Sequence, residues 1–369
     1  MMKMQSFKTT QAALLSTLSA VTAIVERRNT IPILGALRFA DGKITGTNLD
    51  REVTASLGLS GKIDEPFSVA AGQLERLVRH IPKDDEITVS TEGVYGGAQF
   101  AFNGNAYSII GYPAADFPEF KAADFGPQQS IHNAGIIAAM KRVRFAISNE
   151  ETRYYLNGVY FGNYNGAPVI VATDGHRLAM QTIAILPDAL TGLIVPHGLV
   201  DYLVSRKVEP NFVAGAISTS GAPSVRFDYD GLTVKARTID GTFPDFTRVI
   251  PKAPTKRATF DRQKLLTALK RIAAMIGRDM AFVKLSFGQS LLTLSIKNPN
   301  WGNGSENLTS FTKHFAGGYE VGFNARYLIE ALACFTGSDV TLSQDDAGSP
   351  ATITAEGDSL LVVLMPMRD

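Results

Sequence analysis

The sequence predicts an α+β fold of three repeated domains, each with two helices packed on antiparallel sheet. Two landmarks recur at one offset: Thr173 lies 126 positions after Thr47 (173 − 47), and Phe243 lies 126 positions after Phe117 (243 − 117). Self-similarity at a fixed period determines the architecture of a chain. A period near 126 is the size of a compact domain, not of a solenoid repeat. The 369 residues therefore hold three copies, predicted at 1–125, 126–253 and 254–369.

The first helix of each copy carries the same apolar stripe. Its spacing is i, i+1, i+4 and i+7, which places the four side chains on one face of a helix. The three copies of the stripe read Leu14-Leu15-x-x-Leu18-x-x-Val21, Ile136-Ile137-x-x-Met140-x-x-Val143 and Leu265-Leu266-x-x-Leu269-x-x-Ile272. The repeat therefore predicts three equivalent amphipathic helices.

A second helix is predicted in each copy after an apolar strand end. It follows Val69 in copy one, starts near Pro196 in copy two, and follows Asn324 in copy three. Proline suits a helix start, and asparagine is a preferred N-cap. With about eight alternating strands per copy, the helices would cover one face of antiparallel sheet. The predicted linkers, 123–127 and 251–256, are short enough to hold neighbouring domains in a fixed relation.

Composition indicates a soluble globular protein. Hydrophobic residues make up 45% and charged residues 19% of the chain, which excludes intrinsic disorder. No run of about 18 apolar residues predicts a membrane span, and the N-terminus lacks the pattern of a signal peptide. The single cysteine, Cys334, rules out an internal disulfide and fits a reducing compartment. We therefore expect a cytoplasmic location.

The charges are segregated along the chain although the formal net charge is only +1. No acid occurs in 131–148 or in 262–278, and both segments are basic. The pairs Lys141-Arg142 and Lys270-Arg271 occupy the same turn of equivalent helices. A DNA backbone carries a charge about every 1.7 Å, so repeated Lys and Arg can meet it without reading bases. The alternative is a solvated helix face, and copy one has Ser19 and Ala20 instead.

The segment 173–177 (Thr-Asp-Gly-His-Arg) allows three interpretations. Asp174 and His176 could form an acid–base pair, the segment could be a β-turn with a buried histidine, or it could edge a protein-binding pocket. No serine or cysteine elbow accompanies it, and the histidines lack the spacing of metal ligands. Neither a Walker sequence nor a Gly-rich dinucleotide loop is present. We therefore expect no catalytic residue, no metal and no cofactor.

Several motifs together resemble the bacterial DNA polymerase III beta subunit, the replicative sliding clamp. They run in order through the whole chain: 31–35, 113–118, 153–158 (Arg-Tyr-Tyr-Leu-Asn-Gly), 172–179, 243–246 (Phe-Pro-Asp-Phe), 248–251 and 365–368 (Met-Pro-Met-Arg). The resemblance implies the DNA clamp fold and a head-to-tail homodimer that forms a six-lobed ring. In such a ring, helices line the hole and sheets form the outer wall. It also implies a processivity factor without enzymatic activity.

The resemblance also implies three sets of functional residues. A peptide-binding pocket between the second and third domains would comprise Leu156, Thr173, Gly175, His176, Arg177, Leu178, Pro244, Arg248, Val249, Ser349, Val363, Leu364, Met365, Pro366, Met367 and Arg368. DNA-binding residues would be Arg28, Lys141, Arg142, Tyr154, Tyr155, Lys270 and Arg271. The dimer interface would include Tyr107, Ile109, Ala274 and Met275. An adaptable apolar cleft with a polar rim suits short peptides.

The implied partners are double-stranded DNA, a second copy of the chain, the DNA polymerase III catalytic subunit and the clamp loader complex. Other polymerases and repair proteins would bind through short linear peptides, and no membrane partner is expected. Three features depart from the family pattern: Asp369 places an acid beside the peptide groove, Glu150 would repel phosphate, and segment 298–306 is less acidic than usual. The last predicts a dimer that relies more on apolar contact. The rival functions are an enzyme using Asp174 and His176, and a scaffold that binds protein but not DNA.

Overall fold

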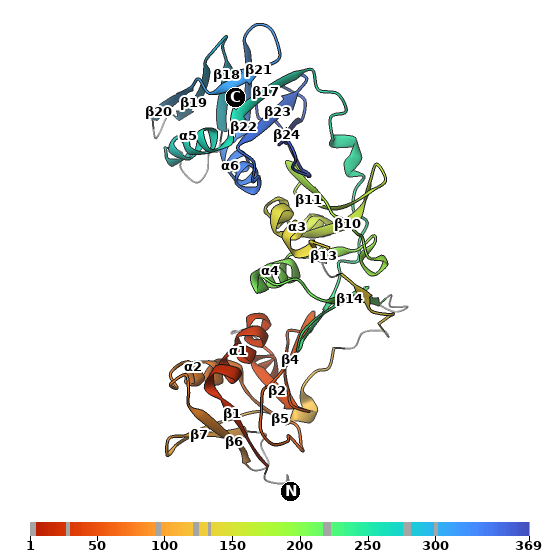
Figure 1. Cartoon of the computed structure of the whole chain (residues 1–369), viewed down its shortest axis with the longest axis vertical. Helices are drawn as coiled ribbons and strands as arrows, with labels where there is room; N and C mark the ends of the chain where they lie inside the picture. Colours follow the sequence, from red (N-terminus) through yellow and green to blue (C-terminus); the bar gives the residue numbers. More distant parts are fainter. Residues whose placement is uncertain are drawn as a thin grey trace. The chain divides into compact units, whose positions relative to one another are not determined.

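The structure is a computed structural model, and it describes residues 5–26, 30–92, 97–120, 125–131, 134–216, 223–275, 282–298 and 302–368 (Figure 1). The chain divides into two compact units, which are described separately. Unit 1 comprises Met1–Asn133, Pro187–Leu190 and Val208–Thr238; unit 2 comprises Ala134–Leu186, Thr191–Lys207 and Ile239–Asp369. No helix in the described ranges combines the length and the apolar character that crossing a membrane requires.

Unit 1 contains two antiparallel sheets and two helices within its described residues. The four-stranded sheet has the order β1 (Ser6–Thr10), β6 (Glu86–Glu92), β7 (Gly97–Phe102), β8 (Asn105–Ile109). The eight-stranded sheet has the order β5 (Phe67–Ala70), β2 (Ala36–Ala40), β3 (Lys43–Thr47), β4 (Arg51–Ser56), β16 (Leu232–Arg237), β15 (Ser224–Tyr229), β14 (Phe212–Ala216), β9 (Gln129–Ser130). The helices are α1 (Gln11–Val21) and α2 (Ala71–Arg79), with 3-10 turns η1 (Thr22–Ile24), η2 (Pro32–Gly35), η3 (Ala114–Asp116) and η6 (Asp188–Leu190).

Unit 2 also contains two antiparallel sheets within its described residues, with four helices. Its nine-stranded sheet has the order β13 (Ile194–Pro196), β10 (Gly158–Tyr164), β11 (Ala167–Thr173), β12 (Arg177–Thr182), β25 (Leu360–Leu364), β24 (Ala351–Thr354), β23 (Asp339–Gln344), β17 (Lys256–Asp261), β21 (Phe311–Lys313). Its four-stranded sheet has the order β20 (Gly302–Leu308), β19 (Leu292–Asn298), β18 (Phe282–Phe287), β22 (Tyr319–Asn324). The helices are α3 (Ile136–Val143), α4 (His197–Arg206), α5 (Arg262–Ala274) and α6 (Ala325–Cys334), with η4 (Arg144–Ala146), η5 (Glu151–Leu156) and η7 (Phe246–Val249).

The predicted helices are confirmed in all three copies. α3 and α5 bury all four stripe residues and α1 buries three, with Leu15 half-buried; each helix packs against the second helix of its copy, α2, α4 or α6 (Figure 1). Asn324 caps α6 as expected, because its side-chain oxygen accepts the backbone N–H groups of Arg326 and Tyr327. The apolar spacing alone therefore locates the helical layer.

Two strand pairs join consecutive repeats. β4 of the first repeat pairs with β16 of the second inside unit 1, and β12 of the second pairs with β25 of the third inside unit 2. Both pairs are antiparallel. The second repeat therefore contributes strands to both units, and the predicted limits 125/126 and 253/254 stay a prediction.

Candidate functional site

One face of the β12–β25 junction in unit 2 is apolar. Leu178 of β12 lies directly opposite Val363 of β25, and both side chains are buried. They belong to one cluster with neighbouring side chains of the same face and with Phe246 and Ile250, which come from a segment that crosses the sheet. The complete buried cluster is Val169, Val171, Leu178, Met180, Phe246, Ile250 and Val363. The junction thus supplies an apolar floor between two polypeptide edges.

The turn from β11 to β12 forms one edge of this floor. Thr173 accepts the backbone N–H of Gly175 at 3.1 Å and donates its hydroxyl to the carbonyl of Arg177 at 2.7 Å. Gly175 has φ +88°, a left-handed conformation that glycine adopts without strain. His176 is exposed, and its carbonyl accepts the N–H of Met365 at 2.9 Å. This hydrogen bond attaches the turn to the C-terminal segment.

The Arg177 side chain is largely buried beneath this turn and does not lie at its exposed edge. Its Nε donates to Asp174 at 3.0 Å, its Nη1 pairs with Glu330 of α6, and its guanidinium lies 4.2 Å from the ring centroid of Tyr327. The guanidinium is also 5.2 Å from the Phe145 ring, and its side chain is only 10% exposed. A guanidinium with these partners is held in place, so it stabilises the turn and is not free for a ligand.

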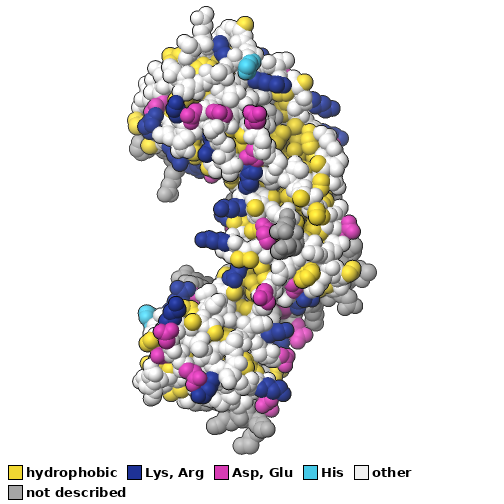
Figure 2. Space-filling model, in the orientation of Figure 1, with side chains coloured by type: hydrophobic (Ala, Val, Ile, Leu, Met, Phe, Trp, Pro, Cys, Tyr) yellow, Lys and Arg dark blue, Asp and Glu magenta, His cyan; other side chains and the backbone are white. Residues whose placement is uncertain are grey.

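The opposite edges of the floor carry exposed apolar side chains. Val249 is 40% exposed at the end of η7, and Met365 is 37% exposed just after β25. Pro244 and Arg248 are also exposed, and Arg248 donates to Asp245 at 2.9 Å. In the space-filling view, apolar side chains reach the surface in patches between charged groups of both signs (Figure 2). Single exposed hydrophobics are ordinary, but Val249 and Met365 flank one buried apolar cluster, and a grouping of this kind suits a ligand.

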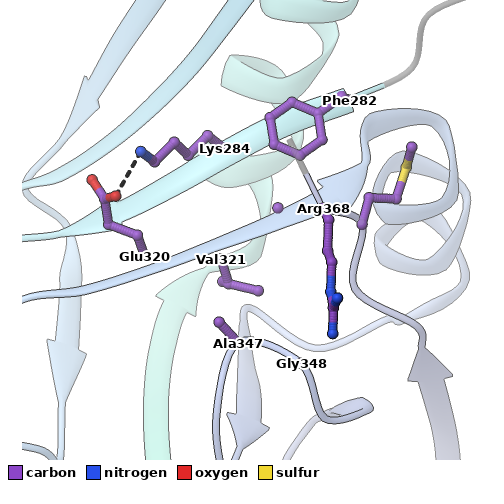
Figure 3. A pocket seen from close by; sticks show the side chains of 9 residues that line it. Phe282, Lys284, Glu320, Val321, Ala347, Gly348 and Arg368 are labelled. Atoms are coloured by element: carbon purple, nitrogen blue, oxygen red, sulfur yellow. Dashed lines mark ion pairs between the residues drawn. The ribbon is translucent and has the colours of Figure 1, made fainter.

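The C-terminal segment continues along the C-terminal repeat. The N–H of Met367 donates to Gly322 at 2.8 Å, and a cavity of about 300 Å³ opens beside it. Figure 3 shows Phe282 and Arg368 over this cavity and the Lys284–Glu320 ion pair, 2.6 Å long, at its side. The lining residues are Phe282, Lys284, Glu320, Val321, Gly322, Ala347, Gly348, Met367 and Arg368. Sequence analysis missed all of them except Met367 and Arg368, since only the fold brings β18, β22 and the β23–β24 turn together.

The remaining expected pocket residues lie in unit 2 at three places. Leu156 is buried at the end of η5, and Leu364 is buried opposite Arg177 in the β12–β25 ladder. Ser349 is half-buried in the β23–β24 turn, where its hydroxyl donates to Asp346 at 2.8 Å. Pro366 is half-buried between Met365 and Met367. Thr173, Leu178, Val363 and Met365 are therefore joined through shared strand pairs and hydrogen bonds, whereas Leu364 and Arg177 form supporting structure.

The basic pair of α3 separates into two different environments. Lys141 is exposed, and it makes no ion pair or hydrogen bond within the described part of the chain. Arg142 is only 22% exposed: two of its nitrogens bind Asp358 at 2.5 and 2.7 Å, and it also donates to Gln181 and to the Cys334 carbonyl. The expected solvated cation at 142 is instead a half-buried bridge between α3 and the C-terminal repeat. Lys141 remains available to an anion.

The pair on α5 is similar. Lys270 is exposed and forms no ion pair with any described residue, whereas Arg271 binds Glu306 of β20 through two hydrogen bonds of 2.7 Å. The hydrogen bonds from Arg271 hold the pKa of the Glu306 carboxyl below its usual range. Arg28 was also expected near DNA, but it lies outside the described residues. Each of α3 and α5 therefore carries one exposed lysine that has no ionic partner among the described residues.

Tyr154 and Tyr155 project from η5 in an edge-to-face pair with ring centroids 5.8 Å apart. Tyr154 is exposed and Tyr155 is half-buried over Gly241, where a Cβ would meet Tyr155 at 3.0 Å. Glu150, the acid expected to repel phosphate, is paired with Arg153 at 2.8 Å. The hydrogen bond from Arg153 lowers the pKa of Glu150, so the carboxylate stays charged and faces a cation in this surface pair.

The four expected interface residues differ in exposure. Tyr107 and Met275 are each 46% exposed, and Ala274 is exposed beside Met275 at the end of α5. Ile109 is buried, so its side chain belongs to the core of unit 1 and only its backbone could contribute to an interface. Tyr107 lies on β8, the last strand of its sheet among the described residues.

The acid–base interpretation of Asp174 and His176 finds no catalytic geometry. Both Asp174 oxygens already accept hydrogen bonds, from the N–H groups of His176 and Arg177 and from the Arg177 side chain. Burial raises the pKa of the Cys334 thiol to about 11, so this thiol is protonated at neutral pH. No cluster of three or more His, Cys, Asp or Glu in the described ranges could hold a metal.

The fold defines a class of protein: a chain of repeated α+β domains joined by antiparallel strand pairs. Models of the DNA polymerase III beta subunit match in order, the N-terminal domain at 5–121, the central domain at 130–245 and the C-terminal domain at 247–368. The beta sliding clamp of Caulobacter vibrioides (strain NA1000 / CB15N) is 31% identical over 97% of this chain and 98% of its own length.

Solved structures agree with this match. A crystal structure of the C. crescentus beta sliding clamp has a TM-score of 0.89 at 29% identity, covering 99% of both chains. The sliding clamp from Bartonella birtlesii bound to griselimycin also has a TM-score of 0.89 at 29% identity, covering 100% of both chains. The chain belongs to the DNA polymerase III beta subunit family, the bacterial beta sliding clamps. It is a DNA sliding clamp, a non-catalytic processivity subunit that works with a DNA polymerase.

Proposed function

We propose that two copies of this chain close head to tail into a ring around duplex DNA, and that each copy docks client peptides at the β12–β25 junction. A closed ring confines a polymerase near its template, so each dissociation becomes an intramolecular rebinding problem. Family membership supports three further parts of the proposal: a clamp loader that opens the ring, other polymerases and repair proteins as partners, and a cytoplasmic location. The rival scaffold that ignores DNA has no support from the family match.

One observation supports the proposed ring. The antiparallel strand pair that joins consecutive repeats occurs twice in the chain, and the two equivalent strands that take no part in these pairs, one in the first repeat and one in the third, remain as sheet edges within the described residues. β4 pairs with β16 and β12 pairs with β25. By position in the repeat, β20 corresponds to β4 and β12, and β8 corresponds to β16 and β25. β8 and β20 are each the last strand of their four-stranded sheets among the described residues. A heterologous contact between β20 of one chain and β8 of its partner closes after two copies.

The DNA proposal rests on Lys141 and Lys270, supported by the exposed Tyr154. Both lysines occupy equivalent exposed positions on α3 and α5 and lack ionic partners within the described ranges. Contacts of this kind bind phosphates without reading bases, so affinity should be weak, independent of sequence and steeply salt-dependent. Arg142 and Arg271 have a carboxylate partner each, so their part in phosphate binding is secondary.

The double variant Lys141→Ala/Lys270→Ala should bind DNA less tightly and with a shallower salt dependence. The slope of log affinity against log salt should fall by about one unit for each phosphate that the variant no longer binds. The measurement is retention of loaded clamp on circular DNA across a salt series, with linearised DNA as the topological control. Lys43→Ala/Lys83→Ala removes two exposed lysines that are not on helices and should leave the slope unchanged. A slope equal to wild type in the first variant would refute the assignment.

The protein should sediment as a dimer at micromolar concentration. Tyr107→Asp or Met275→Asp should shift it to monomer, because each places an unpaired charge in an apolar contact. Val208→Asp is the matched control, since Val208 is also an exposed apolar residue but lies on neither edge. Analytical ultracentrifugation distinguishes these results, and a monomeric wild-type protein at that concentration would exclude the ring.

A further inference from the structure

The β4–β16 junction of unit 1 repeats several hydrogen bonds of the β12–β25 junction at equivalent positions. Thr47 accepts the N–H of Leu49 at 3.1 Å and donates to the carbonyl of Arg51 at 3.0 Å. Asn48 accepts the N–H of Arg51 at 2.9 Å, as Asp174 accepts that of Arg177 at 3.0 Å. These bonds repeat those made by the turn at 173–177, which lies 126 positions later (173 − 47).

The attachment of the next repeat is also duplicated. The carbonyl of Asp50 accepts the N–H of Arg237 at 2.9 Å, and the carbonyl of His176 accepts that of Met365 at the same distance. Arg51 lies opposite Ala236, and Arg177 lies opposite Leu364. The next pair along each ladder is therefore equivalent too: Glu52 with Lys235 in unit 1, and Leu178 with Val363 in unit 2. The chain thus contains a second copy of the peptide-pocket backbone.

The floors of the two copies have opposite chemistry. Leu178 and Val363 are apolar, whereas Glu52 and Lys235 form an ion pair of 2.8 Å. The Glu52 side chain is only 9% exposed, and its second oxygen accepts the N–H of Phe120 at 3.1 Å. Phe120 is the counterpart of Phe246, so this bond fastens the crossing segment of unit 1 directly onto the floor.

The polar character extends along the same face of unit 1. Thr45 and Thr54 share a hydrogen bond of 3.0 Å at the positions that Val171 and Met180 occupy in unit 2. An apolar anchor placed over Glu52 and Lys235 would remove the water that still reaches the Lys235 ammonium, whose side chain is 30% exposed, and would offer no polar partner in its place. Covering a charged group in this way is unfavourable.

We propose that the Glu52–Lys235 pair closes a structural duplicate of the peptide pocket and so restricts each chain to one peptide site. The proposal rests on the proposed function of the β12–β25 junction. Glu52 and Lys235 are specificity-determining residues. They join the first repeat to the second at a strand position whose equivalent, in the junction of the second and third repeats, is the apolar floor. The partner excluded is the same class of short peptide with a Leu or Phe anchor.

The test uses a fluorescent anchor peptide and a chain lacking residues 365–369, in which the pocket of unit 2 is missing one wall. In that background, Glu52→Leu/Lys235→Val should restore saturable binding, at least tenfold tighter than the truncated chain alone. Glu52→Gln/Lys235→Gln removes the charges but keeps the floor polar, and it should restore none. A folded Glu52→Leu/Lys235→Val variant with no saturable binding would overturn the proposal.

If the Glu52→Leu/Lys235→Val variant does not fold, the opposite exchange, made in unit 2, still tests the proposal. Leu178→Glu/Val363→Lys in the full chain transfers the ion pair to the equivalent register and should weaken peptide binding at least a hundredfold while the protein still sediments as wild type. Binding that survives this exchange would overturn the inference. If instead the wild-type chain binds the peptide no better than the truncated chain, the proposed pocket itself fails.

Discussion

Removal of Met365 to Asp369 should abolish peptide binding. Met365 is an exposed apolar wall beside the floor of Leu178 and Val363, and its N–H is bonded to His176 on the facing edge. A short peptide in such a cleft should bind with micromolar affinity, about −8 kcal/mol. Because a few buried anchors carry most of that energy, the absence of one wall should remove binding altogether. Stimulation of the polymerase should disappear with it.

The fold should survive this truncation. The deleted segment contributes two described backbone hydrogen bonds, from Met365 to His176 and from Met367 to Gly322, each worth about 1 kcal/mol net. β25 ends at Leu364, so the ladder with β12 remains. The dimer and its retention on DNA should therefore be nearly unchanged.

Fluorescence anisotropy of a labelled peptide measures the affinity, and sedimentation of the same samples measures assembly. A truncation after Met367 is the matched control: it keeps both hydrogen bonds and the Met365 wall, and it should retain most of the binding. His176→Ala should weaken binding less than the full truncation, because the exposed ring stands on the rim. If the chain ending at Leu364 binds the peptide as tightly as wild type, the pocket assignment is wrong. If that chain does not dimerise, residues 365–369 are needed for assembly.

Local pattern predicted the helices and one cap, but not the partners of strands. The stripe of α5 and the capping oxygen of Asn324 are determined within a few residues, so the sequence shows them directly. β4 pairs with a strand that begins at Leu232, far along the chain, and alternation in β4 does not specify which strand lies beside it. The repeat indicated where equivalent strands occur, and only the fold shows how they are joined.

The same limit explains what sequence analysis missed at the site. An acid-free segment around Arg142 indicated an unpaired cation, but the counter-ion, Asp358, comes from the next repeat. Arg177 matched a pocket motif, yet its guanidinium is held by Glu330 from α6. The pattern of charges along a sequence shows only whether a basic residue has an acid nearby in the chain. It therefore overestimates how many basic residues lack an ion-pair partner in the fold.

Arg142→Met should destabilise unit 2 by about 3–5 kcal/mol, because it leaves a buried carboxylate without its partner. Asp358 is 7% exposed and binds two nitrogens of Arg142, which also satisfies Gln181 and the Cys334 carbonyl. Lys141→Met on the same helix is the matched control: Lys141 is exposed, and the change should be nearly neutral for stability. A DNA-contact role for Arg142 predicts the reverse pattern, with stability retained and the salt dependence of DNA binding flattened.

The destabilisation should depend on pH in a defined direction. Burial alone would raise the pKa of Asp358, but the hydrogen bonds from Arg142 and the backbone outweigh it and leave this pKa below its ordinary value. Asp358 therefore stabilises the wild-type fold above its unfolded pKa, near 4, and this contribution is lost as the pH falls through the lowered folded pKa. In Arg142→Met the unpaired, buried Asp358 should instead have a raised pKa, so it destabilises the variant at neutral pH and ceases to do so once protonated. Urea unfolding of both proteins from pH 7 to pH 3 should show the stability difference shrinking as the pH falls; a constant difference would exclude the ion pair as its cause.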